Sequence, residues 1–170
     1  MGDTVIGTVQ AFNLVGPSTV SVPNTVGAVI MIAPSASVTN LARGANTGKT
    51  SVELTWSTLT SDDSGGSPAD YQVWWDQGSS GAWSVLQTST SGQGYFLNTQ
   101  DFTTGYAYKF YIVAFNVVGS GPASSAITVL TGTAPAGLAA PTTDYDSGLM
   151  STVVQWVPAT DDGGLPPLIY

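Results

Sequence analysis

The chain has 170 residues; 42% are apolar and only 8% are charged, with 11 acidic and 3 basic residues giving a net charge of −8. Ordinary globular proteins carry about 25% charged residues, so Ser and Thr must do most of the solubilising on this surface. So few cations argue against a nucleic-acid partner, because neutralising phosphates requires clustered Lys and Arg. The same deficit argues against an anionic membrane surface as a partner.

His and Cys are both absent from the sequence. Nucleophile pairs of the Ser-His or Cys-His type therefore cannot form, and neither can a zinc site built from those ligands. General acid–base chemistry is poorly supplied as well, because Glu53 is the single Glu and strand alternation would turn it outward. We therefore predict that the chain is not an enzyme and needs no cofactor.

The longest apolar run, Val26–Ala33, is far shorter than the ~20 residues of a membrane-spanning helix, so no membrane insertion is predicted within this segment. Part of that run, Ala28–Pro34, lacks alternation, which predicts burial of both faces. Ser51–Ser57 then alternates apolar and polar residues, as a half-buried β-strand does. The same alternation recurs in Tyr71–Trp75, Tyr108–Ala114 and Ile127–Val129. Short alternating runs between Gly, Ser, Asn and Asp clusters predict an all-β sandwich or barrel.

Internal repeats recur at a period of about 100 residues. Ala11–Gly16 and Ala114–Gly119 share the pattern Ala-Phe-Asn-x-Val-Gly at an offset of 103 residues. At offsets of 98 to 100 residues, Trp56 is echoed by Trp156, Asp62–Pro68 by Asp161–Pro167, and Tyr71 by Tyr170. The repeats predict the C-terminal part of one module over 1–33, a complete module over 34–133, and the N-terminal part of the next over 134–170.

The complete copy resembles the fibronectin type III modules. Phe102–Asn116 and Val117–Ser124 follow the spacing Gly-x-x-Tyr-x-Phe-x-Val-x-Ala-x-Asn-x-x-Gly-x-Gly that is typical of the last third of such modules, with Ile112 in the Val position. The early Trp of the family matches Trp56 and Trp156. Phe102 replaces the usual Leu, and the usual Pro before the Gly is also missing.

This resemblance implies tandem immunoglobulin-like (fibronectin type III) β-sandwiches, with seven strands per module in two antiparallel sheets and no disulfide. The expected strands are Ser37–Leu41, Ser51–Thr58, Tyr71–Asp76, Trp83–Thr88, Tyr95–Asn98, Tyr108–Asn116 and Ser125–Thr131. The expected core comprises Leu54, Trp56, Tyr71, Val73, Phe102, Tyr108, Phe110, Ile112, Ala114, Ile127 and Val129.

One apolar cluster is expected on the outside of the complete module. If Tyr71, Val73 and Trp75 point inward, Trp74 points outward. The neighbouring outward residues would be Tyr111, Val113 and Phe115, extended by Trp83. An exposed patch of this kind marks a contact site, and we expect a protein partner there. Two alternatives remain open: a sugar stacked on Trp74, or cover by the Ser/Gly-rich loop before Trp83 or by a neighbouring module.

The acidic loops are the remaining candidate site. Asp62 and Asp63, with their echoes Asp161 and Asp162, supply the carboxylate oxygens that Ca²⁺ prefers. The sequence Asp-Asp-Gly-Gly is also ordinary turn chemistry, since Asp bonds its own backbone and Gly supplies a positive φ. We favour the turn over a calcium site.

These features together predict a non-catalytic structural and adhesive segment of an extracellular or surface-appendage protein. Its expected partners are other copies or neighbouring modules of the same or a related surface protein. One alternative is a carbohydrate-associated accessory module of a secreted enzyme. Another is an intracellular scaffold module, and the low charge content argues against it.

Overall fold

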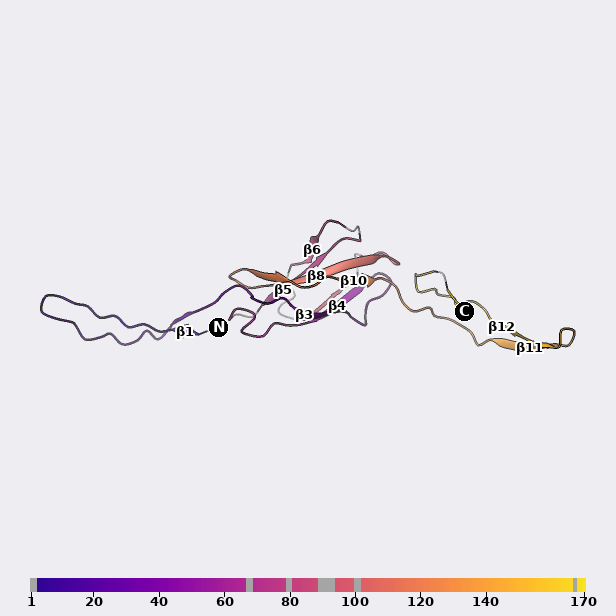
Figure 1. Cartoon of the computed structure of the whole chain (residues 1–170), viewed down its shortest axis with the longest axis horizontal. Coiled ribbons are helices and arrows are strands. Elements are labelled where there is room, and N and C mark those ends of the chain that lie inside the picture. The colour runs from indigo at the N-terminus through magenta and orange to yellow at the C-terminus, as the bar shows by residue number, and fades with distance from the viewer. Residues whose placement is uncertain (1–2, 67–68, 79–80, 89–93, 100–101, 167) are drawn as a thin grey trace.

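The computed structural model describes residues 3–66, 69–78, 81–88, 94–99, 102–166 and 168–170. Every regular element in this part of the chain is a β-strand, which confirms the expected all-β class. No helix among the described residues is long and apolar enough to cross a membrane. The chain is elongated: a long hairpin, a central sandwich and a second hairpin follow one another along its longest axis (Figure 1).

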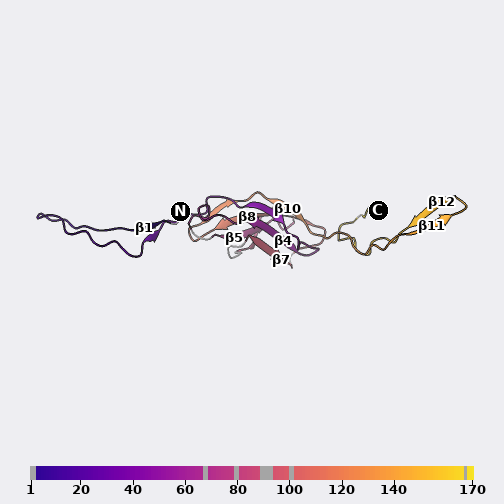
Figure 2. The same cartoon turned by 90° about the horizontal axis from the view of Figure 1, so that it is seen from below.

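The central sandwich consists of two antiparallel sheets, seen from a second direction in Figure 2. The smaller sheet has the order β3-β4-β7, with bounds Thr39–Arg43, Val52–Ser57 and Tyr95–Asn98. The larger sheet has the order β10-β8-β5-β6, with β9 paired to β8. Its strands are β5 (Asp70–Trp75), β6 (Ser84–Gln87), β8 (Ala107–Phe115), β9 (Ser120–Ala123) and β10 (Ile127–Leu130).

The core lies between the inner faces of these sheets. Tyr71 and Val73 of β5 stand opposite Ala114 and Ile112 of β8, so alternate residues of both strands face the same interior. Every residue of the expected core is buried except Ile127, which is partly buried against it. The sequence pattern missed Val38, Val52, Ala69 and Phe96, which are also buried. Each large side chain in this core contributes about 1.5–3 kcal/mol to the stability of the sandwich.

The seven expected strands all exist, with ends within two residues of those expected. The sequence did not predict β9, which lies between the last two expected strands and ends just before Ser124. The Ser124 backbone N–H donates to the carbonyl oxygen of Ile112 at 2.9 Å, and its hydroxyl oxygen accepts the Ile112 N–H at 2.9 Å. This side-chain hydrogen bond replaces one of the usual backbone pairs and separates β9 from β10.

Glu53 points outward from β4 as expected, but it is buried rather than exposed to solvent. The loop between β3 and β4 folds over the outer face of β4 at this position. The Glu53 carboxylate accepts hydrogen bonds from the backbone N–H of Asn46 at 2.5 Å and from its side-chain amide at 3.1 Å. The buried carboxylate is therefore satisfied within the loop, and alternation along β4 could not reveal this cover.

Residues 3–33 form an extended hairpin that points away from the sandwich (Figure 1). Its base pairs β1 (Thr4–Val5) with β2 (Ala28–Val29), and an isolated bridge joins Phe12 to Pro17 near the tip. Burial of both faces of Ala28–Pro34 was a wrong expectation, because residues 28–32 are exposed. The reason is that, among the described strands, β2 pairs with β1 alone.

The C-terminal part pairs β11 (Thr142–Asp146) with β12 (Ser151–Gln155) in a second hairpin. Trp156 comes directly after β12, and its counterpart Trp56 lies within β4. The surroundings of the two rings differ. Trp156 is 52% exposed, whereas Trp56 is 7% exposed. Among the described strands β11 and β12 pair only with each other, so no second sheet covers Trp156.

Candidate interaction surface

The predicted outer residues lie together on the larger sheet. In the β5–β8 ladder Trp74 stands opposite Tyr111, and Gln72 stands opposite Val113. Residues directly opposite in an antiparallel pair project to the same side, so these side chains share the outer face. Phe115 follows Val113 two residues later on that face. The expected juxtaposition of the two strands is therefore present.

Three aromatic rings cluster on this face. The rings of Trp74 and Tyr111 lie 5.7 Å apart between centroids with an interplanar angle of 11°. Trp83, which precedes β6, approaches the same Tyr111 ring at 4.5 Å and 57°. Stacked and tilted aromatic contacts of this kind contribute about 0.5–1.5 kcal/mol beyond their buried area. We call the set Trp74, Trp83, Val85, Tyr111, Val113 and Phe115 the aromatic patch.

The aromatic patch is only partly covered by its own packing. Trp74, Tyr111, Val113 and Phe115 are half-buried, while Trp83 and Val85 are each 38% exposed. Val85 joins the patch because it stands opposite Trp74 in the β5–β6 ladder, a position the sequence pattern had not singled out. Burial raises the pKa of the Tyr111 hydroxyl, so it remains a neutral hydrogen-bond donor. The patch offers flat apolar area with few charges, which suits contact with another apolar surface.

The first acidic loop is a tight turn between β4 and β5. The Asp63 carboxylate accepts a hydrogen bond from the hydroxyl of Thr60 at 2.8 Å, and the Gly65 N–H donates to the carbonyl oxygen of Asp62 at 3.1 Å. In the second loop the Asp162 carboxylate accepts the Gly164 N–H at 2.7 Å. These contacts are the turn chemistry expected from the sequence.

Asp161 makes a longer-range contact. Its Oδ1 atom lies 2.6 Å from the Nζ atom of Lys49, which belongs to the loop between β3 and β4 of the central sandwich. The hydrogen bond from Lys49, with a second from the Gly163 N–H, lowers the pKa of the Asp161 carboxyl below its ordinary value. Within the described ranges, no group of three acidic side chains lies close enough to share a metal ion. The two acidic loops act as separate structural turns in this structure.

Two residues with structural roles were not singled out from the sequence. Asn116, at the turn after β8, donates its side-chain amide to the carbonyl oxygens of Ile32 at 2.7 Å and Ser64 at 2.9 Å. Lys49 joins the central sandwich to the second acidic loop. Asn116 lies in the repeated Ala-Phe-Asn motif, so the repeat was the available signal; nothing local marked Lys49.

A family model described as the fibronectin type III domain matches residues 35–130. The match covers more than half of the chain, and the two-sheet topology agrees with it. The chain belongs to the fibronectin type III family. No curated protein matches the chain.

Two of the solved structures with similar folds are multi-domain segments. A crystal structure of the FN1–FN3 domains of chicken CNTN1 is 17% identical, with a TM-score of 0.54 over 91% of this chain and 54% of that one. A crystal structure of domains from titin is 20% identical, with a TM-score of 0.56 over 76% of this chain and 41% of that one. This chain therefore spans about half the length of those structures, and at such identities the likeness concerns the fold alone.

Proposed function

We propose that the chain is a non-catalytic structural segment of a tandem fibronectin type III array in an extracellular or surface-appendage protein. Its complete module would cover residues 34–133, between the end of one module (1–33) and the start of another (134–170). The aromatic patch would be the contact face for a second copy of the same chain. The single observation that carries this proposal is the cluster of Trp83, Tyr111 and Trp74 on the outer face of the larger sheet.

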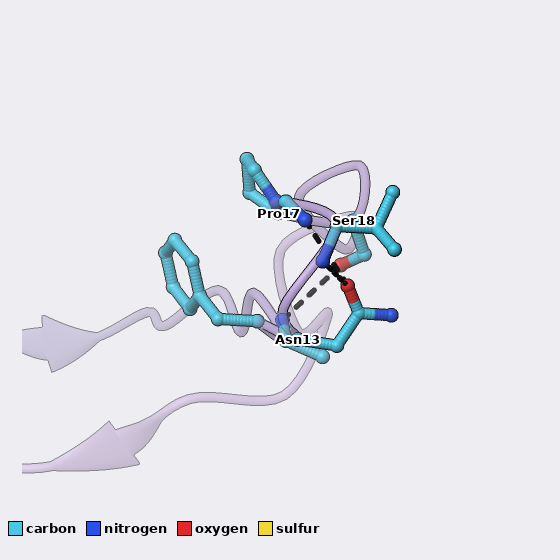
Figure 3. Close-up of a pocket in the computed structure, with 7 residues that line it drawn as sticks. Asn13, Pro17 and Ser18 are labelled. Carbon is cyan, nitrogen blue, oxygen red and sulfur yellow. Dashed lines mark hydrogen bonds between the residues drawn. The ribbon is translucent and has the colours of Figure 1, made fainter.

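Repeated local geometry supports the tandem arrangement. Asn116 closes its turn by accepting the N–H groups of Val118 at 2.8 Å and Gly119 at 3.2 Å with its side-chain oxygen. Asn13, at the tip of the N-terminal hairpin, accepts the corresponding N–H groups of Val15 and Gly16 at 2.8 and 3.1 Å (Figure 3). The same side chain thus closes the same turn in two segments 103 residues apart.

The packing of the rings favours a protein partner over a sugar. Trp74 is stacked on Tyr111, so one of its faces is already covered. A saccharide that stacks on Trp needs an open ring face, whereas a protein surface can use ring edges and the aliphatic neighbours as well. Val85 and Val113 beside the rings supply such neighbours. We therefore place protein packing ahead of carbohydrate binding.

The proposal is tested by analytical ultracentrifugation of the purified chain over a range of concentrations. We expect reversible association, because an apolar patch of this kind is costly to leave in water. Phe115→Asp should abolish association while the far-UV circular dichroism stays unchanged. Leu130→Asp is the matched control. Leu130 is 45% exposed and stands opposite Ala107, which is at the end of β8 far from Phe115.

Two outcomes would refute packing between copies through the patch. One is a chain that stays monomeric up to millimolar concentration. The other is association that Phe115→Asp and Leu130→Asp weaken equally, since this would mean that association does not depend on the aromatic patch in particular. Quenching of Trp fluorescence by added oligosaccharides, lost in Trp74→Ala, would instead favour a carbohydrate partner.

A further inference from the structure

The linkers on the two sides of the complete module make the same pair of backbone hydrogen bonds. Before the module, the N–H groups of Ile32 and Ser35 donate to the carbonyl oxygens of Gly65 at 3.1 Å and Asp63 at 2.9 Å. After it, the N–H groups of Thr133 and Ala136 donate to the carbonyl oxygens of Gly163 at 3.0 Å and Asp161 at 2.9 Å. Each linker therefore binds the acidic loop that follows it, through two donors three residues apart.

Each of these linkers has Ala-Pro between its two donors, Ala33-Pro34 in the first and Ala134-Pro135 in the second. Pro fixes its own φ and restricts the residue before it to extended conformations, so the spacing of the two donors is set in advance.

Each acidic loop presents a glycine that the linker approaches closely. Gly65 has a φ of +80° and Gly163 a φ of +75°, a region that favours glycine. A Cβ atom added to Gly65 would collide with the carbonyl oxygen of Ile32, and one added to Gly163 would collide with that of Thr133. The loop sequence thus permits both the turn and the close backbone contact.

The first linker has a further contact from its own module. The Asn116 side-chain amide bridges the carbonyl oxygen of Ile32 in the linker and that of Ser64 in the acidic loop. It ties three segments together: the linker, the acidic loop and the turn after β8. The amide of Asn13 has no such hydrogen bond among the described residues, and Figure 3 shows its nitrogen pointing away from the turn.

The second linker has a further contact from the preceding module. Lys49 of the central sandwich pairs with Asp161 of the following acidic loop. Leu165 of that loop lies against the backbone at Gly132, where an added Cβ atom would come within 2.7 Å of it. The acidic loop is therefore seated on the end of the module before it.

We infer that the acidic loop is the docking element of a repeated joint between consecutive modules, and that its partner is the linker and the end of the preceding module. This inference rests on the tandem arrangement proposed above. A complete joint has four parts: the Ala-Pro linker, the acidic Gly-Gly loop, an Asn from the turn of the following module, and a Lys from the preceding one. The joint holds the relative orientation of neighbouring modules by backbone hydrogen bonds.

Amide hydrogen exchange of the full chain, read by NMR, tests the joint directly. We expect the N–H groups of Ile32, Ser35, Thr133 and Ala136 to exchange slowly. Gly163→Ala should speed exchange at Thr133 and Ala136 about tenfold, because losing a hydrogen bond of ordinary strength costs about that factor. Ile32 and Ser35 should be unaffected, which shows that the sandwich remains folded.

A matched pair of variants tests the Asn contact. Asn116→Asp keeps the oxygen that closes the turn but removes the amide donor to the carbonyl oxygen of Ile32. The linker should then be held less firmly, so the Ile32 N–H should exchange faster. Asn13→Asp makes the same change in the same turn without that partner, and it should leave exchange at Ile32 unchanged. Slow exchange at Ile112 in both variants controls for loss of the fold.

The inference fails if the four linker amides exchange at the rate of a free chain, or if Gly163→Ala leaves Thr133 and Ala136 unchanged. These outcomes are independent of the aromatic patch. If Phe115→Asp abolishes association but the linker amides are unprotected, the joint is refuted and the proposed contact face is supported. Protected linkers with association insensitive to Phe115→Asp would do the reverse.

Discussion

The Tyr71 hydroxyl accepts a hydrogen bond from the backbone N–H of Leu59 at 2.8 Å, and Tyr170 accepts one from Ala159 at 2.9 Å. In both places a Tyr after the acidic loop ties down the chain that leaves the preceding strand. Each Tyr also lies near the repeated Trp: Trp56 and Tyr71 are 5.6 Å apart between ring centroids, and Trp156 and Tyr170 are 6.2 Å apart. The C-terminal part therefore holds the same Trp–Tyr contact, although its Trp is exposed.

Tyr71→Phe tests how much this hydrogen bond contributes to the stability of the central sandwich. Removing the hydroxyl leaves the Leu59 N–H without its acceptor, so we expect the free energy of unfolding to fall by about 1–3 kcal/mol. Urea unfolding followed by circular dichroism measures the change. Tyr106→Phe is the control, because Tyr106 is 55% exposed and its change should stay within about 0.5 kcal/mol. Equal losses in the two variants would contradict the role of the Leu59 contact.

The two repeated Trp residues should differ sharply in their contribution to stability. Trp56→Ala removes a ring from a packed core, and we expect a loss of about 3–5 kcal/mol in the unfolding of the central sandwich. Trp156→Ala removes a ring that is 52% exposed and lies outside that core, so the same transition should move by less than about 0.5 kcal/mol. A large effect of Trp156→Ala would mean that the two rings share one interior.

The strands were predictable because alternation and the family pattern both report burial by a facing sheet. Val52 and Phe96 were absent from the expected core although they lie on strands whose positions were correct, since alternation alone does not rank neighbours on one face. Glu53 shows a different limit. Its cover comes from a loop, and the hydrogen bonds from Asn46 depend on the path of that loop rather than on any period in the sequence.

The outer face was predictable for the same reason as the core, because residues between inward positions must point outward. Val85 was missed because its place opposite Trp74 depends on a register shift between Val73 and Trp74 in the β5–β6 ladder, which the sequence does not show. The Lys49–Asp161 pair spans 112 residues, and no local pattern encodes such a contact. The backbone hydrogen bonds of the linkers are invisible in the sequence as well, since every residue except Pro carries the same N–H group.

Lowering the pH should weaken the contact between Lys49 and Asp161. The pKa of Asp161 in the folded chain lies below its ordinary value of 3.8, chiefly because Lys49 hydrogen-bonds to the carboxylate. The contact therefore contributes fully above that ordinary value and is lost as the pH falls through the lowered one. NMR titration of the Asp161 carboxyl measures the shift. Lys49→Gln should move the titration towards the ordinary value, and an unchanged titration would contradict the pairing. Added salt should weaken the pair too, because both side chains are partly exposed.

Chelation of divalent cations should leave the chain unaffected. The carboxylates of Asp63, Asp161 and Asp162 already accept hydrogen bonds from Thr60, Lys49 and loop N–H groups. We expect the same melting temperature in EDTA and in millimolar Ca²⁺, measured by differential scanning calorimetry. A rise in Ca²⁺ that disappears in Asp62→Asn would reinstate a calcium site in the first loop.

In the proposed tandem array, the order in which the linker contacts occur along the chain would determine the response to stretching. Tension arriving from the N-terminal side meets the Ile32 and Ser35 hydrogen bonds before it reaches β3 and its pairing with β4. A short extension can therefore be absorbed outside the sandwich, by a segment that needs only two backbone contacts to re-form. Each module would thus be protected from mechanical unfolding by a weaker, rapidly reversible element placed ahead of it.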